Sequence, residues 1–383
     1  MGSANKGAQE HRDLMVRWGV SCPMRPDELL TSWLARTALA FGCDPLVLTD
    51  EIWPKWRAWT RDIDRDCPKD RLDELAWISG TELDRLLAAR LRPVAEKLSE
   101  HPLNDRAGWS WILAIGTRNR RRYGGLQYCP ACLAEDTHPY YRRAWRFAWN
   151  SACDHHGSRL LDRCPSCRAP IEPHRLVYGA CTVAFCASCG GNLADGHTMA
   201  ADAKLLAFQR RAGEVVGEGG ALYGDQWLTT PEWFAVVRHL VGLLRRAAIT
   251  PRSHLGEMIR ALGVSLKSDH RPKTGLRLEL LSSWERTPLL RDAWVMMAQG
   301  PDGLLAAARD AGVSAKGFKI ERRNKLPSVL QDICTGLPRG ADRGGGPRAT
   351  PHRRQSLRIP PPRPREQVEQ MWARLQRKAR MGP

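Results

Sequence analysis

Apolar residues recur at helical spacing in two parts of the chain, which flank a middle segment of different character. In the first part, the segment PDELLTSWLARTALAFG starts at Pro26 and brings a leucine, tryptophan or alanine back to one face every three or four positions. The acidic first turn and the terminal Gly42 mark the two ends of one amphipathic helix. Two shorter helices are predicted around residues 72–77 and 81–91.

The second part begins at Ala201 and is again helical in pattern. ADAKLLAFQRRAGEVV and, from Pro231, PEWFAVVRHLVGLLRRAA place apolar residues at steps of three and four, with arginines at other positions. Two further helical candidates start at Thr287 (TPLLRDAWVMMAQ) and at Pro301 (PDGLLAAARDAGVSAKGFKIERRNKLPSVLQDI). We find no internal repeat of solenoid length.

The middle segment, residues 129–190, has no long apolar run and is rich in proline, glycine and cysteine. Such a segment is typical of a small module that is held in shape by bound metal and not by a large core. The predicted fold class is therefore mainly α with a small, irregular, zinc-stapled module. The predicted organisation is a flexible leader (1–20), an N-terminal helical domain (21–128), a tandem zinc-binding module (129–195), a C-terminal helical domain (196–336) and a basic tail (337–383), expected to be disordered and to carry a short last helix (366–380).

Metal-ligating residue types in the middle segment fall into four pairs, and two residues separate the members of each pair. This spacing lets one tight turn present both side chains to a single tetrahedral ion. Eight ligands fill two closed zinc sites, whereas a set of buried free cysteines would not produce four matched pairs. The pairs are Cys129 and Cys132, Cys153 and His156, Cys164 and Cys167, and Cys186 and Cys189.

The spacing leaves the connectivity of the two zinc sites open. A sequential scheme joins the first pair to the second and the third pair to the fourth, and an interleaved scheme joins the first to the third and the second to the fourth. His155 could replace His156, and Cys181 could compete with Cys186. We favour His156 because Gly157 follows it and permits a close approach to the metal.

The same motifs argue against catalysis by this chain. A closed four-ligand site has no open position for a reacting water. The sequence contains neither H-E-x-x-H nor the deaminase combination of H-x-E with P-C-x-x-C, and it lacks the G-x-x-x-x-G-K-[ST] phosphate loop. The protein is predicted not to be an enzyme, and an activity on nucleic acid is only the third alternative.

Charge points to a polyanionic partner. Lys and Arg number 59 against 41 Asp and Glu, which gives a formal net charge of +18. This excess attracts nucleic acid, although a solvated basic surface without a specific partner is the plain alternative. The segment from Ala308 through the turn residue Gly312 to the capping residue Ser314 has helix-turn-helix spacing, which recurs in weaker form at Ala38 and Gly42. The second helix of the C-terminal motif would present to DNA the cations Lys316, Lys319, Arg322 and Arg323.

A second basic segment, YYRRAWRFAW, alternates arginines with aromatic rings inside the middle segment. Arg142 and Arg143 are candidate contacts to nucleic acid, because arginine beside stacking rings suits such a groove. The alternative is that Trp145 and its neighbouring rings form the core of the module while the arginines stay solvated. The three tryptophans of IWPKWRAW, spaced three apart, are interpreted as a core stripe.

No segment has the 18 or so consecutive apolar residues of a membrane span, and the start of the chain lacks the apolar core of a signal peptide. The expected location is the cytoplasm of a bacterium, on the nucleoid when the protein is bound to DNA. In that reducing compartment paired thiols indicate metal ligands and not disulfides.

Several of these motifs occur together, and in order, in a known family. PDELLTSWLARTALAFG, then YCPACLAEDTHPYYRRAWRFAW, C-x-x-H-G, C-P-x-C and C-x-x-C-G resemble the TniQ proteins of bacterial transposons, which are related to the target-selecting protein TnsD. The resemblance covers roughly residues 20–195, about half of the chain. It implies the sequential set of eight zinc ligands, while the basic tail matches nothing in the family.

The resemblance also implies a function. TniQ-like proteins are accessory factors that connect a target site to an AAA+ ATPase, which activates the transposase, and in CRISPR-associated elements they dock on an RNA-guided effector complex. The expected partners are therefore DNA or a target-bound nucleoprotein, the ATPase and a CRISPR effector complex, with a homodimer left open. The alternative is a stand-alone, zinc-containing, sequence-specific DNA-binding regulator.

Overall fold

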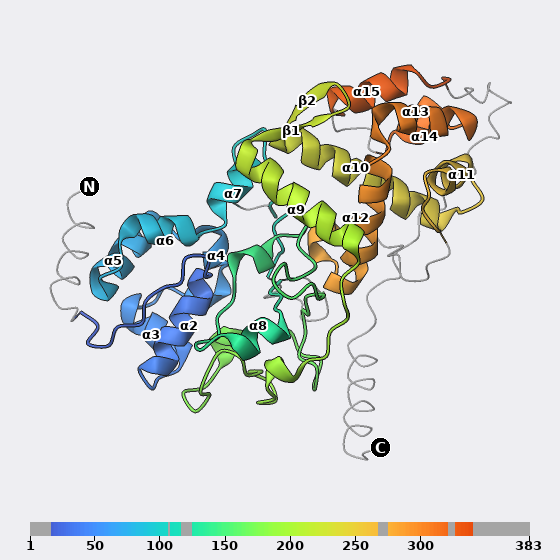
Figure 1. Cartoon of the computed structure of the whole chain (residues 1–383). Coiled ribbons are helices and arrows are strands. Elements are labelled where there is room, and N and C mark those ends of the chain that lie inside the picture. Colours follow the sequence, from blue (N-terminus) through green and yellow to red (C-terminus); the bar gives the residue numbers. More distant parts are fainter. Residues whose placement is uncertain (1–16, 106–107, 116–124, 267–274, 321–325, 340–383) are drawn as a thin grey trace, which may run out of the picture. The chain divides into compact units, whose positions relative to one another are not determined.

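The protein is described here by a computed structural model. All described residues belong to one compact unit, Met1–Arg339. The described part is mainly helical, with a single two-stranded sheet and an irregular segment rich in cysteine, which confirms the predicted fold class (Figure 1). The described residues are 17–105, 108–115, 125–266, 275–320 and 326–339.

Six α-helices and one 3-10 helix, η1 (Ala58–Thr60), are described in the first hundred residues. The helix predicted from the first amphipathic segment forms between Leu30 and Ala40, and Gly42 ends it with a φ of 71°, as a left-handed stop requires. A short turn leads into a second helix with Asp44 before it and Pro45 at its first position. The helices are α2 (Leu30–Ala40), α3 (Pro45–Ile52), α4 (Ile63–Asp66), α5 (Lys69–Ser79), α6 (Leu83–Ala89) and α7 (Arg92–Lys97).

The N-terminal helices bury a core of their own. Trp33 and Trp53 are among its fully buried side chains, and Trp56 and Trp59 pack at its edge, half-buried. The predicted tryptophan stripe is therefore a core feature. Its outer member also reaches the cysteine-rich segment, because the ring of Trp59 stacks on His174 with the ring centroids 5.3 Å apart.

The cysteine-rich segment has little regular structure. Isolated antiparallel bridges, such as Tyr128 with Leu161 and Arg163 with Pro170, hold successive turns together. Its only helical pieces among the described residues are α8 (Pro130–Glu135) and the 3-10 turns η2 (Arg143–Arg146), η3 (Pro173–Arg175) and η4 (Leu193–Asp195).

The chain from Ala203 onward is a helical assembly with one hairpin. The hairpin pairs Gly220 with Thr229 in antiparallel register and was not predicted. Capping boxes of Thr229 with Glu232 and of Ser282 with Glu285 fix the starts of two long helices. The elements are α9 (Ala203–Glu218), β1 (Gly220–Tyr223), β2 (Gln226–Thr229), α10 (Thr230–Ile249), α11 (His254–Ala261), η5 (Leu278–Leu280), α12 (Ser283–Met297), α13 (Gly300–Asp310), α14 (Ala315–Phe318) and α15 (Ser328–Thr335).

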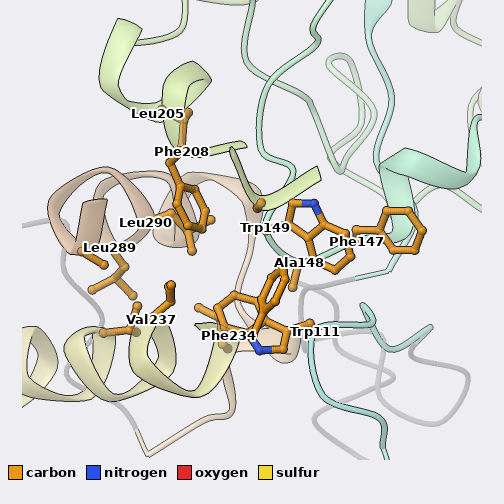
Figure 2. Close-up of a cluster of buried hydrophobic side chains, with 14 of the residues drawn as sticks. Trp111, Phe147, Ala148, Trp149, Leu205, Phe208, Phe234, Val237, Leu289 and Leu290 are labelled. Carbon is orange, nitrogen blue, oxygen red and sulfur yellow. The ribbon is translucent and has the colours of Figure 1, made fainter. Parts of the chain in front are cut away.

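A larger core joins the cysteine-rich segment to these C-terminal helices (Figure 2). The rings of Phe147 and Trp149 stack 4.5 Å apart, and Trp149 lies 5.1 Å from Phe234 of α10. Trp111 approaches the same phenylalanine edge-on at 5.0 Å. The prediction that these rings are core residues is confirmed, and the core they build is shared with α10.

A buried arginine ties the N-terminal helices to the cysteine-rich segment. The side chain of Arg146 is fully buried and donates to both Asp62 and Asp64, at 2.6 and 3.2 Å, and to the backbone oxygen of Leu113. Asp64 also accepts hydrogen bonds from the hydroxyl and backbone N–H of Thr31 in α2. One interpretation of the sequence expected the arginines of this segment to be solvated, and for Arg146 this is wrong. Its side chain is buried and holds two parts of the fold together.

Candidate metal centres and nucleic-acid interface

The first group of ligand-type side chains is Cys129, Cys132, Cys153 and His156, whose ligand atoms all lie within 4.8 Å of one another. The three sulfurs are 3.3–3.5 Å from the Nδ1 atom of His156. With zinc–ligand bonds of about 2.0–2.3 Å, ligand atoms around a tetrahedral ion are separated by about 3.5–3.8 Å. The side chains therefore fit one zinc ion.

The second group is Cys164, Cys167, Cys186 and Cys189, again with all ligand atoms within 4.8 Å. The sulfurs of Cys164 and Cys189 are 3.7 Å apart, and those of Cys167 and Cys186 are also 3.7 Å apart. Four thiols at this separation suit a tetrahedral zinc as well. The two groups have the arrangement of the sequential scheme, and His155 and Cys181 lie outside both of them.

Three of the four pairs sit in turns of the same geometry. In each turn the backbone oxygen of the first ligand accepts a hydrogen bond from the residue four positions later, and its N–H donates to the carbonyl five positions later. The residue four positions after the first ligand adopts a left-handed conformation in every case, with φ between 58° and 71°. The first ligands are Cys153, Cys164 and Cys186, and the left-handed residues are Gly157, Arg168 and Gly190.

The fourth pair is positioned by a helix. Cys129 is the residue before α8, Pro130 is the first residue of that helix, and Cys132 follows one turn on. The same helix carries Glu135, whose Oε2 atom lies 2.9 Å from Nε2 of His156. This contact raises the pKa of His156 and favours the tautomer in which Nδ1 faces the sulfurs as a metal ligand.

The two groups differ in their exposure to solvent. All three cysteines of the first group are at most 3% exposed, whereas Cys167 and Cys189 of the second group are exposed. A thiol hydrogen bond between Cys129 and Cys132 lowers the pKa of Cys129 and raises the pKa of Cys132, so Cys129 is the thiol of this pair that loses its proton first. A bound ion would have its four positions filled by side chains in either group, which is typical of structural and not of catalytic zinc.

Arg142 and Arg143, the first two candidate nucleic-acid contacts, are engaged inside the protein. The guanidinium of Arg142 binds the carboxylate of Asp136 through two hydrogen bonds of 2.9 and 3.1 Å and stacks 4.4 Å from the ring centre of Tyr140. Arg143 donates to the backbone oxygen of Ala88. Arg142 therefore stabilises the cysteine-rich segment itself, and Arg143 joins that segment to the N-terminal helices.

The C-terminal candidates lie at a turn that forms as predicted, although its second helix is shorter. Gly312 has a φ of 69°, and the hydroxyl of Ser314 accepts a hydrogen bond from the N–H of Gly317. The helix that follows, α14, ends at Phe318, so the expectation that one helix would carry all four cations is wrong. Lys316 and Lys319 are exposed, and Arg322 and Arg323 lie outside the described residues.

The weaker occurrence predicted at Ala38 and Gly42 forms the same turn, in which Gly42 donates to Leu39 and Cys43 donates to Ala38. A further turn of this kind was not predicted. Gly263 after α11 has a φ of 81° and donates to Arg260, and Val264 donates to Ile259. Gly312 and Val313 make the same two bonds after α13. This turn could have been predicted from the sequence, because ALGVS (residues 261–265) and DAGVS (residues 310–314) are identical in three of five positions.

The fold and these groups define a mainly helical protein with two cysteine-rich centres able to hold metal. The TniQ family model matches residues 20–160, which confirms the resemblance to that family. The matched region contains α2, the N-terminal helices and the whole first ligand group, and it ends before the second group. No curated protein matches the chain.

The match associates the chain with transposition, through an accessory family that is generally non-catalytic. None of the helices within the described ranges combines the length and the apolar character needed to cross a membrane.

Proposed function

We propose that this protein is a non-catalytic accessory factor of DNA transposition, which connects target DNA, or a nucleoprotein bound to the target, to an AAA+ ATPase and its transposase. The observation that carries the proposal is the TniQ match over residues 20–160. The net charge of +18 supports contact with nucleic acid. On this proposal the protein works in the bacterial cytoplasm, and a CRISPR effector complex is one form that the target-bound nucleoprotein could take.

We further propose that the eight residues of the two groups hold two structural zinc ions. The donor set supports this, because it consists of seven thiols and one imidazole at tetrahedral separation. Bound zinc would cross-link three turns and the start of α8 in a segment that has little regular structure, so its binding energy would contribute to folding. Elemental analysis of the purified chain should give two zinc ions per molecule, and fewer than one would refute the two-site assignment.

The adaptor role is tested by capture and by insertion. The tagged full-length chain, incubated with the candidate ATPase, should retain that ATPase, and deletion of its gene should abolish targeted insertion in cells that keep the transposase. Capture of a CRISPR effector complex in the same experiment would identify an RNA-guided target. Strand cleavage or joining by the isolated chain would contradict a non-catalytic role.

The second candidate, a stand-alone DNA-binding regulator, is favoured by the helix-turn-helix spacing at Gly312 and Ser314. A regulator would bind one operator sequence with high preference and would leave insertion unaffected when deleted. Selection of bound sequences from a random duplex library separates the two functions, because an adaptor with a nucleoprotein target is expected to show no single preferred sequence.

A further inference from the structure

One face of α10 holds the segment that follows the turn at Gly312. The ring of His239 lies 5.2 Å from that of Phe318, and Arg246 donates from Nη1 to the backbone oxygens of Gly317 and Lys319, at 2.9 and 3.2 Å. These contacts fix α14 against the second half of α10.

Gly242, between the two contacts on α10, makes the approach possible. A Cβ atom at this position would lie 2.5 Å from the Cδ1 atom of Ile320, so the missing side chain leaves room for that isoleucine. Residues 239, 242 and 246 are three and four apart and therefore form one stripe along the helix. The stripe fixes the backbone on both sides of Lys319.

The two segments that these contacts join carry three exposed cations. Arg246, Lys316 and Lys319 are all exposed, and none of them forms an ion pair with another described residue. Arg246 uses one nitrogen to bind backbone oxygens, which orders its guanidinium without neutralising the charge. Arg252, exposed just beyond the end of α10, adds a fourth cation along the chain.

The neighbouring helices carry few free carboxylates. Glu257 of α11 lies 3.7 Å from the ring nitrogen of His254, and this histidine is the side chain nearest to Gly312, 3.5 Å from the point that a Cβ atom on that glycine would occupy. Asp310, at the end of α13, is the exposed acidic residue closest in sequence to the turn. The net charge around the turn is therefore positive.

We propose that Arg246, Lys316 and Lys319 form a surface that binds the phosphate backbone of duplex DNA; this inference rests on the proposed contact of the protein with target DNA. Phosphate contacts need exposed, ordered cations and no particular base sequence. With four residues, α14 is about 6 Å long and too short to lay a row of side chains along a major groove. The surface would therefore position the protein on DNA and would not read its sequence.

The test is the salt dependence of DNA binding by the full-length chain. The variant combines Arg246→Gln, Lys316→Ala and Lys319→Ala, which removes all three charges and keeps a polar side chain at position 246. The control combines Arg57→Ala, Lys204→Ala and Arg210→Ala, which removes three exposed cations that lie elsewhere. The probes are two duplexes of unrelated sequence, and fluorescence anisotropy gives the affinity between about 50 and 200 mM salt.

We expect the variant to bind both duplexes at least about tenfold more weakly and to lower the slope of log K against log salt by about 3, one for each cation. The control should show a much smaller decrease in both the affinity and the slope. The proposed surface would be wrong if variant and control lost equal affinity, if the slope were unchanged, or if only one duplex bound more weakly.

Capture of the ATPase separates this inference from the proposed function. If the wild-type chain retains the ATPase but the variant binds DNA normally, the surface is wrong and the adaptor function stands. If the wild-type chain fails to retain the ATPase while the variant loses DNA binding, the surface is supported and the adaptor function fails. Matching thermal unfolding of variant and wild type shows that a loss of binding is not a loss of fold.

Discussion

Single residues in the cysteine-rich turns carry a measurable conformational cost. Gly157, Arg168 and Gly190 occupy equivalent positions with positive φ, but glycine adopts this region freely whereas a residue with a Cβ atom does so at a cost of about 1–2 kcal/mol. The backbone bonds of the turn, including the 3.0 Å bond from the N–H of Arg168 to the oxygen of Cys164, keep the arginine in this conformation.

Replacing Arg168 by glycine should therefore stabilise the metal-loaded protein. We expect the free energy of unfolding in urea to rise by about 0.5–1 kcal/mol, since the relief of strain exceeds the greater freedom of glycine in the unfolded chain. The matched change Gly157→Ala should lower it by about 1 kcal/mol, because space for a Cβ exists there and only the conformation is unfavourable. A destabilising Arg168→Gly would show that the arginine side chain contributes more than the strain costs.

His239 should make stability depend on pH. Burial lowers its pKa to about 4, partly offset by a hydrogen bond with the backbone of Phe318. Between pH 4 and 6.5 the unfolded chain binds a proton at this residue and the folded chain does not, so stability falls as the pH decreases through this range. The loss should approach about 3 kcal/mol near pH 4.

The difference between wild type and His239→Gln isolates this residue from other titrating groups. Urea unfolding at a series of pH values gives the free energy of unfolding of both proteins. The difference between the two free energies should change between pH 6.5 and pH 4 and should be constant above pH 6.5. Parallel curves would show that His239 takes up its proton equally in both states.

Among the helices, length and periodicity decided what could be predicted. The long amphipathic helices α9 and α10 follow the apolar pattern of the sequence, whereas α12 begins at Ser283, four residues before the predicted segment. The helices α3 and α11 have eight residues each, so their apolar repeats are too short to stand out.

The hairpin and α14 depend on tertiary contacts. Each strand of the hairpin has four residues, and the ring of Trp227 covers Gly220 so closely that a Cβ atom there would lie 2.9 Å from it. The helix after Ser314 ends early because residues 317–320 bond to α10, a contact that no local pattern reveals. The ligand pairs, in contrast, could be predicted from the sequence because two residues separate the members of each pair. Which pairs share one site could not be derived from this spacing, because it depends on the tertiary structure.

The two metal groups should release their ions at different rates. The first group is buried in the core shared with the C-terminal helices, while two of the four thiols of the second group are exposed. A chromogenic chelator should therefore extract zinc in two steps, one ion each, with the fast step from the second group. Cys167→Ser should remove the fast step alone, and loss of the slow step in that variant would contradict the assignment.

Across the molecule, the buried charges join parts that are distant in sequence. Arg146 links the segment of η2 to Asp62 and Asp64, more than eighty residues earlier. Glu279 of η5 likewise accepts from the backbone N–H of Trp111 at 2.7 Å and pairs with Arg238 of α10. We expect such contacts to couple the unfolding of the N-terminal helices to that of the rest of the described part, although these helices bury a core of their own.

Removing Arg146 tests this cooperation most directly. Arg146→Ala leaves Asp64 buried without its counter-ion, and breaking a buried ion pair in this way costs about 3–5 kcal/mol. Burial already raises the pKa of Asp64 to about 6 against the opposing effect of Arg146, so without the arginine Asp64 should hold a proton at neutral pH.

In the folded variant Asp64 then keeps its proton at pH values at which Asp64 of the unfolded chain has already released it. Its stability should therefore fall as the pH rises, and its deficit relative to wild type should be smaller at pH 5 than at pH 8. Arg92→Ala serves as the control, because Arg92 pairs with Asp66 and Asp105 at a partly exposed site and its loss should cost about 1 kcal/mol or less. A small, pH-independent loss in Arg146→Ala would show that the buried pair does not connect the N-terminal helices to the cysteine-rich segment energetically.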